Sequence, residues 1–264
     1  MDKVFTGEWG LVLGASSGFG MATAKELASR GMNIFGVHFD RRSAMDKINQ
    51  DIEEMKSHGV DVEYFNINAA DEEKRLTTVQ AIKEQAGDKP CRMVLHSLAF
   101  GSLKAYAADT PDEEINQKQV EMTLDVMANS LVYWVQDLRR AGLIGKGSRI
   151  YGLTSSGGSR AWPFYGAVSA AKAALEAHIR QFAFEMGKEG VRANSICAGV
   201  TVTPALKKIP ENENLISEAT KRNPSGRMTT PEDVAKTIAI LCLPEAEWIN
   251  GSIIYVDGGE NFVA

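Results

Sequence analysis

The apolar residues of this chain alternate between short continuous runs and longer stretches with a helical period. Short runs between turn residues are typical of buried strands, and apolar positions three and four residues apart are typical of amphipathic helices. The pattern predicts strands at 11–13, 33–39, 62–67, 93–95, 149–153, 192–197 and 251–256. It predicts helices at 21–30, 42–58, 72–85, 166–187 and 231–243, and one or two long helices over 112–141.

Strands and helices therefore alternate along almost the whole chain. A strand that is followed by a helix and then by another strand usually forms a parallel pair with the helix packed against the sheet. We expect an α/β protein in which a single Rossmann-type, doubly wound parallel sheet has helices on both faces. The 264 residues fit one large domain spanning 1–264, and no internal repeat interrupts the pattern.

Composition and charge narrow the function classes. Apolar residues make up 44% of the chain and charged residues 24%, as in ordinary proteins with a folded core. The 29 basic and 34 acidic residues give a net charge of −5, which argues against a nucleic-acid partner. No apolar run approaches the roughly 20 residues that span a bilayer, and the N-terminus lacks a signal-peptide pattern. We therefore expect no association with a membrane.

The cysteines and histidines indicate a compartment and argue against a metal. Cys91, Cys197 and Cys242 are odd in number, widely spaced and set among apolar neighbours, as buried thiols in a reducing compartment are. The cytoplasm is therefore the expected location. The four histidines are too scattered along the chain to suggest a metal site.

A glycine-rich loop, Gly14-Ala-Ser-Ser-Gly18-Phe-Gly20, directly follows the first predicted strand and precedes the first predicted helix. Glycines let the backbone turn tightly and approach a pyrophosphate, and the helix places its positive N-terminal end against the phosphates. Such a motif is weak alone, since the glycines could serve only a tight turn. Its position between a strand and a helix favours a dinucleotide-binding loop.

The end of the second predicted strand bears on the choice of cofactor. A carboxylate there binds the ribose 2′-hydroxyl of NAD, whereas an arginine accepts the 2′-phosphate of NADP. Asp40 lies late for the ribose contact and could instead cap the next helix. We therefore expect NADPH, with Arg41 or Arg42 on the phosphate, and NADH as the alternative. Ser17 adds no basic residue to the glycine loop.

Tyr165 and Lys172 stand close together far downstream of this loop, with six residues between them. A phenol can donate a proton, and a nearby cation can lower its pKa. Together with the glycine loop, the pair suggests hydride chemistry on a nicotinamide cofactor. Taken separately, Tyr165 could be a core aromatic residue and Lys172 a solvated charge on a helix.

The glycine loop, the Tyr–Lys pair and the closing Tyr255-Val-Asp-Gly-Gly259 resemble the short-chain dehydrogenase/reductase family over essentially the whole chain. Most members of that family place fewer residues between the catalytic Tyr and Lys. The spacing of six is similar to that of the enoyl-acyl-carrier-protein reductases. His96-Ser-Leu-Ala99, Asp125 and Cys197-Ala-Gly199 also resemble that branch.

Within the branch, the chain resembles the type III, NADPH-dependent enoyl reductases. The glycine loop has the ordinary spacing, the accessory tyrosine is replaced by Ser155, and Thr203-Pro-Ala-Leu-Lys207 and Asn223-Pro-Ser-Gly-Arg-Met228 are similar. The resemblance implies an enoyl reductase of bacterial type II fatty-acid synthesis that acts on trans-2-enoyl thioesters. The competing hypotheses are a reductase of 3-oxoacyl thioesters or other carbonyl compounds, and a non-catalytic NADP-binding regulator.

The resemblance also implies roles for individual residues. Tyr165 would stabilise the enolate oxygen, Lys172 would hydrogen-bond the nicotinamide ribose, and Ser155 would donate a second hydrogen bond. Ser155 could equally serve a turn or a cap, and Asp125 could be structural. Contacts with the cofactor are expected from Gly14, Ser16, Ser17, Gly18, Phe19, Gly20, Arg41, Arg42, Asn68, Ala69, Ser97, Lys172, Gly199, Val200 and Thr203.

Substrate and partner contacts are expected near the C-terminal third of the chain. Segment 204–227 is polar and weakly periodic, as a substrate-binding lid would be. Four aromatic residues could line an acyl pocket or belong to the core, namely Phe100, Tyr106, Trp162 and Phe164.

The substrate would be carried by an acyl carrier protein or by CoA. Since an acyl carrier protein is acidic, four basic residues form a candidate docking patch or merely a solvated face, namely Lys207, Lys208, Lys221 and Arg222. The resemblance further implies a homotetramer assembled through the helices of 112–141 and 166–187.

Overall fold

The computed structural model describes residues 3–209 and 212–263. Within them the strands are β1 (Trp9–Leu13), β2 (Asn33–His38), β3 (Val62–Asn66), β4 (Cys91–His96), β5 (Arg149–Ser155), β6 (Arg192–Ala198) and β7 (Ile253–Val256). The α-helices are α1 (Gly18–Ser29), α2 (Met45–Lys56), α3 (Glu72–Ala86), α4 (Gln117–Leu124), α5 (Ser130–Arg140), α6 (Gly166–Met186), α7 (Asn212–Arg222) and α8 (Pro231–Leu241).

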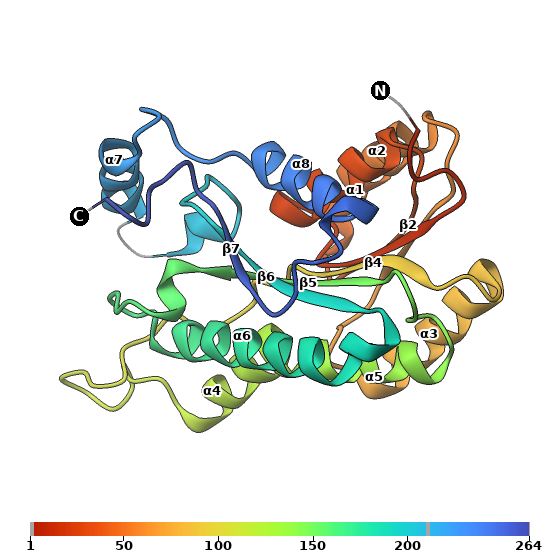
Figure 1. Ribbon diagram of the computed structural model, residues 1–264. Coiled ribbons are helices and arrows are strands. Elements are labelled where there is room, and N and C mark those ends of the chain that lie inside the picture. The colour runs from red at the N-terminus through yellow and green to blue at the C-terminus, as the bar shows by residue number, and fades with distance from the viewer. Residues whose placement is uncertain (1–2, 210–211, 264) are drawn as a thin grey trace.

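The strands form one parallel sheet in the order β3-β2-β1-β4-β5-β6-β7, which confirms the predicted doubly wound fold. The chain winds outward from β1 in one direction and from β4 in the other. The strand order therefore reverses between β1 and β4, and ligands of such sheets bind beyond the carboxyl ends of the strands at this point. In Figure 1 that edge lies at the left, where α7 and the loop before α4 extend past the sheet.

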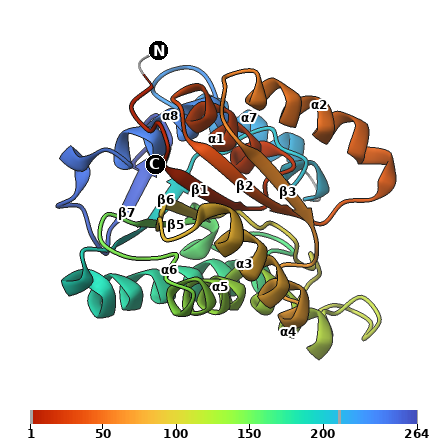
Figure 2. The same cartoon turned by 90° about the vertical axis from the view of Figure 1, so that its right-hand side faces the viewer.

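Helices cover both faces of the sheet, as Figure 2 shows, with α1, α2 and α8 on one face and α3, α5 and α6 on the other. Each face has its own apolar core. Successive residues of β1 supply both cores, since Leu11 and Leu13 pack on the side of α3, α5 and α6 while Val12 packs on the side of α1 and α8. A strand buried on both faces requires a continuous apolar run, and the run at 11–13 has this character.

Two predicted helices have different boundaries from those expected. The long helix of 112–141 begins only at Gln117, because Asn116 and Gln119 form a reciprocal capping box there. A π-helical turn from Asp125 to Asn129 then separates α4 from α5. The helix of 42–58 begins with a short 3₁₀ turn at Arg42–Ala44, so that α2 itself starts at Met45.

The predicted lid segment 204–227 contains regular structure that its sequence pattern does not predict. Leu206–Lys208 form a 3₁₀ turn, and α7 follows over Asn212–Arg222. Positions 210 and 211 of this segment, like 1, 2 and 264 of the predicted domain, lie outside the described residues. Across the described ranges, no helix is both long and apolar enough to cross a bilayer.

Candidate functional site

The glycine loop lies against the end of β4, and its glycines are required by close backbone contacts. Gly14 has φ +91°, and a Cβ built on it would lie 2.5 Å from the Ser97 carbonyl oxygen. A Cβ on Gly20 would overlap the Gly14 carbonyl oxygen. The Gly14 N–H also donates to the Val37 carbonyl oxygen at 2.8 Å. The loop is therefore held tightly between β1, β2 and β4, at the point where the strand order reverses.

Helix α1 starts directly from this loop and presents free backbone donors. Ser17 is the N-cap residue in extended conformation, and its side chain makes no capping hydrogen bond. The N–H groups of the first turn, including those of Gly18, Phe19 and Gly20, have no acceptor within the helix. Such a helix end attracts anions, and phosphate groups above all.

The end of β2 is organised by Asp40, which does not cap a helix. The Asp40 carboxylate contacts His38 Nδ1 at 3.0 Å, and its backbone exchanges two hydrogen bonds with the side chain of Asn66. Arg41 and Arg42 follow on the surface, exposed. Within the described part of the chain, neither arginine side chain has an ion pair or hydrogen bond, so both guanidinium groups are available to a ligand.

The ends of β3 and β4 bring three further predicted residues to the same edge. The Ser97 N–H donates to the Leu13 carbonyl oxygen at 2.8 Å, next to the glycine loop. Ala69 is buried, and its carbonyl oxygen accepts a hydrogen bond from Trp134 Nε1 at 2.9 Å. The side-chain oxygen of Asn68 accepts the Ala70 N–H, which fixes the turn after β3.

Tyr165 is buried at the start of α6, beside Ser155 at the end of β5. Tyr165 is 8% exposed, and burial raises the pKa of its hydroxyl, whereas the neighbouring Ser155 hydroxyl lowers this pKa to a smaller extent. By distance and angle, the buried Ser155 Oγ has no hydrogen-bond partner among the described residues. Phe164, with φ +61°, is the one non-glycine residue of the described chain in the left-handed region. This costs free energy and sets the direction of the chain into Tyr165.

Lys172 points into the sheet edge from α6. Its Nζ is buried and donates to the Leu153 carbonyl oxygen at 2.6 Å. Burial lowers the pKa of Lys172 to about 8, while Glu176 raises it to a smaller extent. The sequence suggested that Lys172 lowers the pKa of Tyr165, but the pKa of Tyr165 is raised and Lys172 is not among its causes. The reason is that the ammonium group is directed at the backbone of β5.

His96, the first residue of the His96-Ser-Leu-Ala99 motif, is a core residue at the end of β4. It is fully buried, its Nε2 lies 2.9 Å from Ser130 Oγ, and burial lowers its pKa to about 3. Asp125 accepts a hydrogen bond from the Tyr133 hydroxyl at 2.9 Å within the π-helical turn. These contacts support structural roles for both side chains.

The loop after β6 completes the edge and includes residues that sequence reasoning missed. A Cβ on Gly18 would lie 3.4 Å from Thr203 Cγ2, so this loop faces the glycine loop. Gly199 packs against Thr229, and the Val200 N–H donates to Glu260 Oε2 at 3.0 Å. The sequence marks Glu260 only by its position directly after the Gly258-Gly259 pair.

Aromatic side chains lie close to the start of α6, where Tyr165 is buried. The ring of Trp162 lies 5.3 Å from that of Tyr165, and Tyr106 packs over Gly166, where a Cβ would lie 2.7 Å from its ring. Tyr106 and Phe164 are 57% and 41% exposed. Exposed aromatic rings beside a buried phenol form a surface that suits an apolar chain rather than a closed core.

The residues at this edge fit a dinucleotide. The glycines of the loop place backbone without side chains where a pyrophosphate would approach α1. Two arginines that have no partner among the described residues follow β2. The buried Ser155 Oγ likewise lacks a partner among those residues. The predicted site residues come from the carboxyl ends of β1, β4, β5 and β6 or from the segments that follow these strands. They are the residues of the glycine loop, together with Ser97, Ser155, Tyr165, Lys172 and Thr203. Their roles toward a ligand remain predictions.

The fold and these residues define a Rossmann-type α/β protein with a Tyr–Lys pair at the sheet edge. A family model described as enoyl-(acyl carrier protein) reductase matches residues 14–261. The chain is 32% identical to enoyl-[acyl-carrier-protein] reductase [NADH] FabI of Bacillus subtilis, over 71% of this chain and 70% of the relative. It therefore belongs to the enoyl-[acyl-carrier-protein] reductase family, within the short-chain dehydrogenase/reductases, as the sequence predicted.

Other relatives match over different lengths. The chain is 29% identical to enoyl-[acyl-carrier-protein] reductase [NADH] 2 of Rhizobium meliloti, over 100% of this chain and 95% of that one. It is 33% identical to the FabI protein of Buchnera aphidicola, but that match spans only 64% of the relative's length, and the match to the Aquifex aeolicus relative spans 61%.

Solved structures show the same fold at low identity. An enoyl-[acyl-carrier-protein] reductase (NADH) from Aquifex aeolicus matches with a TM-score of 0.84 and 24% identity, over 98% of both chains. An enoyl-(acyl-carrier-protein) reductase from Anaplasma phagocytophilum, solved in complex with NAD, matches with a TM-score of 0.81 and 21% identity, over 100% of this chain and 95% of that one.

The depressed pKa of Lys172 predicts how stability changes with pH. Its folded pKa of about 8 lies below the ordinary lysine value of 10.5, so above pH 8 the unfolded chain binds more protons than the folded one. The free energy of unfolding of the wild type, relative to Lys172→Met, should therefore rise between pH 8 and 10.5. Urea unfolding of both proteins at several pH values measures this. A difference that stays constant over that range would contradict a buried, easily deprotonated lysine.

Proposed function

We propose that this protein is an enoyl-[acyl-carrier-protein] reductase that reduces trans-2-enoyl thioesters in bacterial type II fatty-acid synthesis. Membership of the family supports the reaction class. The observation that carries the proposal is the buried Tyr165 hydroxyl at the carboxyl edge of the sheet, beside Ser155 and near a buried lysine.

A reduced nicotinamide supplies the hydride for this reaction. Hydride delivery to the β-carbon of an enoyl thioester moves negative charge onto the thioester oxygen. Because burial raises the pKa of Tyr165, its phenol stays protonated at neutral pH and can donate a hydrogen bond to that oxygen. In a site with little water, such a donor stabilises the developing charge strongly.

Ser155 and Lys172 would support the tyrosine in different ways. The unpartnered Ser155 Oγ would donate a second hydrogen bond to the same oxygen. Lys172 would donate a hydrogen bond to the ribose of the cofactor. This bond would replace its hydrogen bond to the Leu153 carbonyl oxygen or be made in addition to it. The aromatic rings of Tyr106, Trp162 and Phe164 would cover the acyl chain, and segment 204–227 would form the lid over it.

Replacement of Tyr165 by Phe removes the donor and keeps the ring. We expect the rate of trans-2-enoyl thioester reduction, followed by cofactor absorbance at 340 nm, to fall by about 10²- to 10³-fold. The affinity for the cofactor should change little. Tyr255→Phe, on an exposed tyrosine of β7, is the matched control and should retain wild-type activity.

Competing activities give different results in the same assay. Turnover of 3-oxoacyl thioesters in place of enoyl thioesters would identify a carbonyl reductase, with Tyr165 protonating an alkoxide. Cofactor binding without turnover of either substrate would identify a regulator. Either outcome would overturn the proposed reaction.

For the cofactor, we propose NADPH in preference to NADH. The support is that Arg41 and Arg42 are exposed and, within the described residues, unpaired after β2, while Asp40 is occupied by His38 and Asn66. Against it stand the relatives, whose names specify NADH. A single charged hydrogen bond from arginine to a 2′-phosphate suffices to distinguish the two cofactors.

The paired replacement of Arg41 and Arg42 by Ala tests this choice. We expect the KM for NADPH to rise about tenfold or more, because charge-assisted hydrogen bonds to the 2′-phosphate are lost, while the KM for NADH changes less than about twofold. Lys236→Ala, at an exposed position of α8, serves as the control. Equal effects on both cofactors, or a wild type that prefers NADH, would contradict the proposal.

We propose an acyl carrier protein, with CoA as the alternative, as the carrier of the substrate. Of the four basic residues expected to dock it, Lys221 pairs with Glu218 at 3.0 Å and Arg222 faces Glu260 at 3.9 Å. Lys207 and Lys208 are exposed, and within the described residues their side chains have no ion pair. They are the better candidates for contact with an acidic partner.

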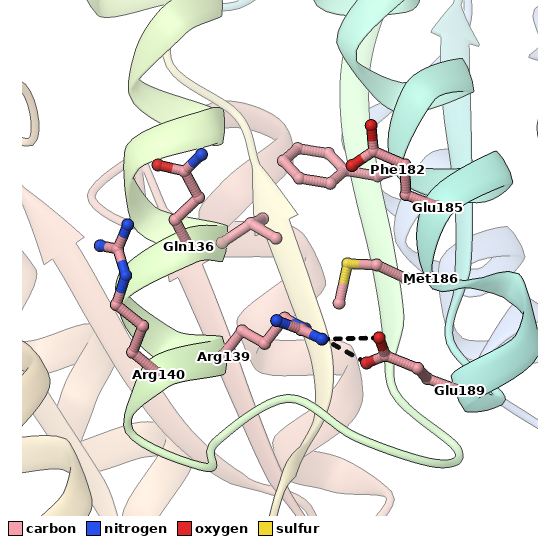
Figure 3. A pocket seen from close by; sticks show the side chains of 8 residues that line it. Gln136, Arg139, Arg140, Phe182, Glu185, Met186 and Glu189 are labelled. Carbon is pink, nitrogen blue, oxygen red and sulfur yellow. Dashed lines mark hydrogen bonds and ion pairs between the residues drawn. The ribbon is translucent and has the colours of Figure 1, made fainter.

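We also propose a homotetramer that packs through α5 and α6. A groove of about 330 Å³ runs between the two helices near their C-terminal ends. Figure 3 shows Phe182 and Met186 of α6 facing Gln136 and Arg139 of α5 across it, with Arg139 bonded to Glu189. Phe184 of α6, which does not line the groove, is 82% exposed. A partner subunit would cover the exposed Phe184 ring.

Phe184→Glu should weaken this assembly, since it places a charge on the proposed interface. Light scattering after size exclusion should give the mass of four chains for the wild type and a smaller mass for the variant. Leu76→Glu on α3, an exposed leucine away from α6, should remain tetrameric. A monomeric wild type would contradict the proposal.

For the location we propose the cytoplasm. All three cysteines are free and buried, and burial raises the pKa of each thiol to about 12. Buried thiols that stay protonated suit a reducing compartment.

A further inference from the structure

Glu260 is a buried carboxylate that the proposed reaction does not use. It is 3% exposed and follows a turn in which Gly258 and Gly259 have φ +62° and +92°. This turn directs the side chain inward, beneath the loop after β6. A buried carboxylate is costly unless other groups compensate its charge.

The Glu260 side chain is bound to the loop that faces the glycine loop. Its Oε2 accepts the Val200 N–H at 3.0 Å. A Cβ on Gly199 would lie 3.0 Å from the same oxygen, so the loop backbone packs directly on the carboxylate. Thr203, three residues after Val200, approaches Gly18 at the start of α1. Glu260 therefore sets the position of a loop that reaches the phosphate-binding end of α1.

The same carboxylate faces the end of α7. Arg222 lies 3.9 Å from Glu260 Oε1, and its Nε is buried without a partner in the described residues. Asn223 donates to the Asp257 carbonyl oxygen at 2.8 Å, and Arg160, from the loop before α6, donates to the Asn261 carbonyl oxygen at 2.9 Å. The C-terminal segment thus joins the lid helix, the loop before Tyr165 and the loop after β6.

The groups around Glu260 shift its pKa in opposite directions. Burial raises the pKa of Glu260, and Asp257 of its own segment raises it further. The Val200 N–H, Arg222 from α7 and Arg160 from the loop before α6 lower it. An apolar side chain would fill the space at a lower desolvation cost, so the carboxyl group has a use that packing alone does not explain.

We propose that Glu260 is a positioning residue, which holds the Gly199–Thr203 loop in its cofactor-binding position and couples this loop to the lid helix α7 through Arg222. The inference rests on the proposed function only in taking that loop as part of the cofactor site. It is therefore tested by cofactor binding rather than by turnover.

Three variants separate the contributions of the carboxylate. Glu260→Ala removes the acceptor for the Val200 N–H, and we expect it to weaken binding of NADPH and NADH about tenfold, measured by nicotinamide fluorescence titration. Glu260→Gln keeps an acceptor of the same shape and should bind within about threefold of the wild type. The exposed Glu73→Gln on α3 is the control and should bind as the wild type does.

The pH dependence distinguishes positioning by charge from simple packing. Wild-type binding should weaken as the pH falls through the pKa of Glu260, because protonation removes the negative charge that strengthens its hydrogen bond with the Val200 N–H and attracts Arg222. This loss of affinity at low pH is the acid limb of the binding curve, and Glu260→Gln should lack it. Arg222→Gln, which removes a group that lowers the pKa of Glu260, should move the limb to higher pH.

Several results would overturn the inference. Wild-type affinity in Glu260→Ala would show that the loop does not depend on the carboxylate, and tighter binding would show that Glu260 competes with the cofactor for the Val200 N–H. If the alanine variant does not fold, an unchanged acid limb in both Glu260→Gln and Arg222→Gln would overturn it equally. Cofactor binding without enoyl reduction would contradict only the proposed function, whereas a wild type that binds neither cofactor would contradict both.

Discussion

The close approach of two backbone segments between β1 and β4 is the constraint on which the rest of the site depends. A Cβ at position 14 would lie only 2.5 Å from the Ser97 carbonyl oxygen, so only glycine allows the two strand ends to meet there. This contact lies where the strand order reverses, and it places the positive end of α1 over the opening between the strands. The glycine loop is thus a packing requirement of the sheet and a phosphate-binding surface at once.

Burial of the polar groups at the same edge gives the site its chemical character. Tyr165 remains a neutral donor because burial raises its pKa, and burial likewise lowers the pKa of Lys172 to about 8, which favours its neutral form. Water around an exposed phenol would compete for the substrate oxygen and weaken its hydrogen bond. The strained backbone at Phe164 and the bond from Lys172 to Leu153 hold both side chains in place before any ligand arrives.

Features that are local in the sequence could be predicted, and features that depend on distant contacts could not. The sheet, its strands and the Gly14–Gly20 loop follow from short runs of residues, and the spacing of Tyr165 and Lys172 is likewise local. Helix α7 has only three apolar residues, too few to distinguish its pattern from that of a polar loop. Glu260 binds Val200 across 60 residues, and Lys172 is directed at the Leu153 carbonyl oxygen rather than at Tyr165, which no spacing reveals.

If this edge of the sheet directs hydride to the β-carbon of an enoyl thioester, a label on the cofactor must appear at that carbon. The purified protein is incubated with a trans-2-enoyl thioester and NADPH or NADH deuterated at both C4 positions, and the product is examined by mass spectrometry and NMR. We expect a saturated thioester with one deuterium at its β-carbon. An unlabelled product, an unreacted enoyl thioester, or deuterium delivered only to the carbonyl carbon of a 3-oxoacyl thioester would contradict this expectation.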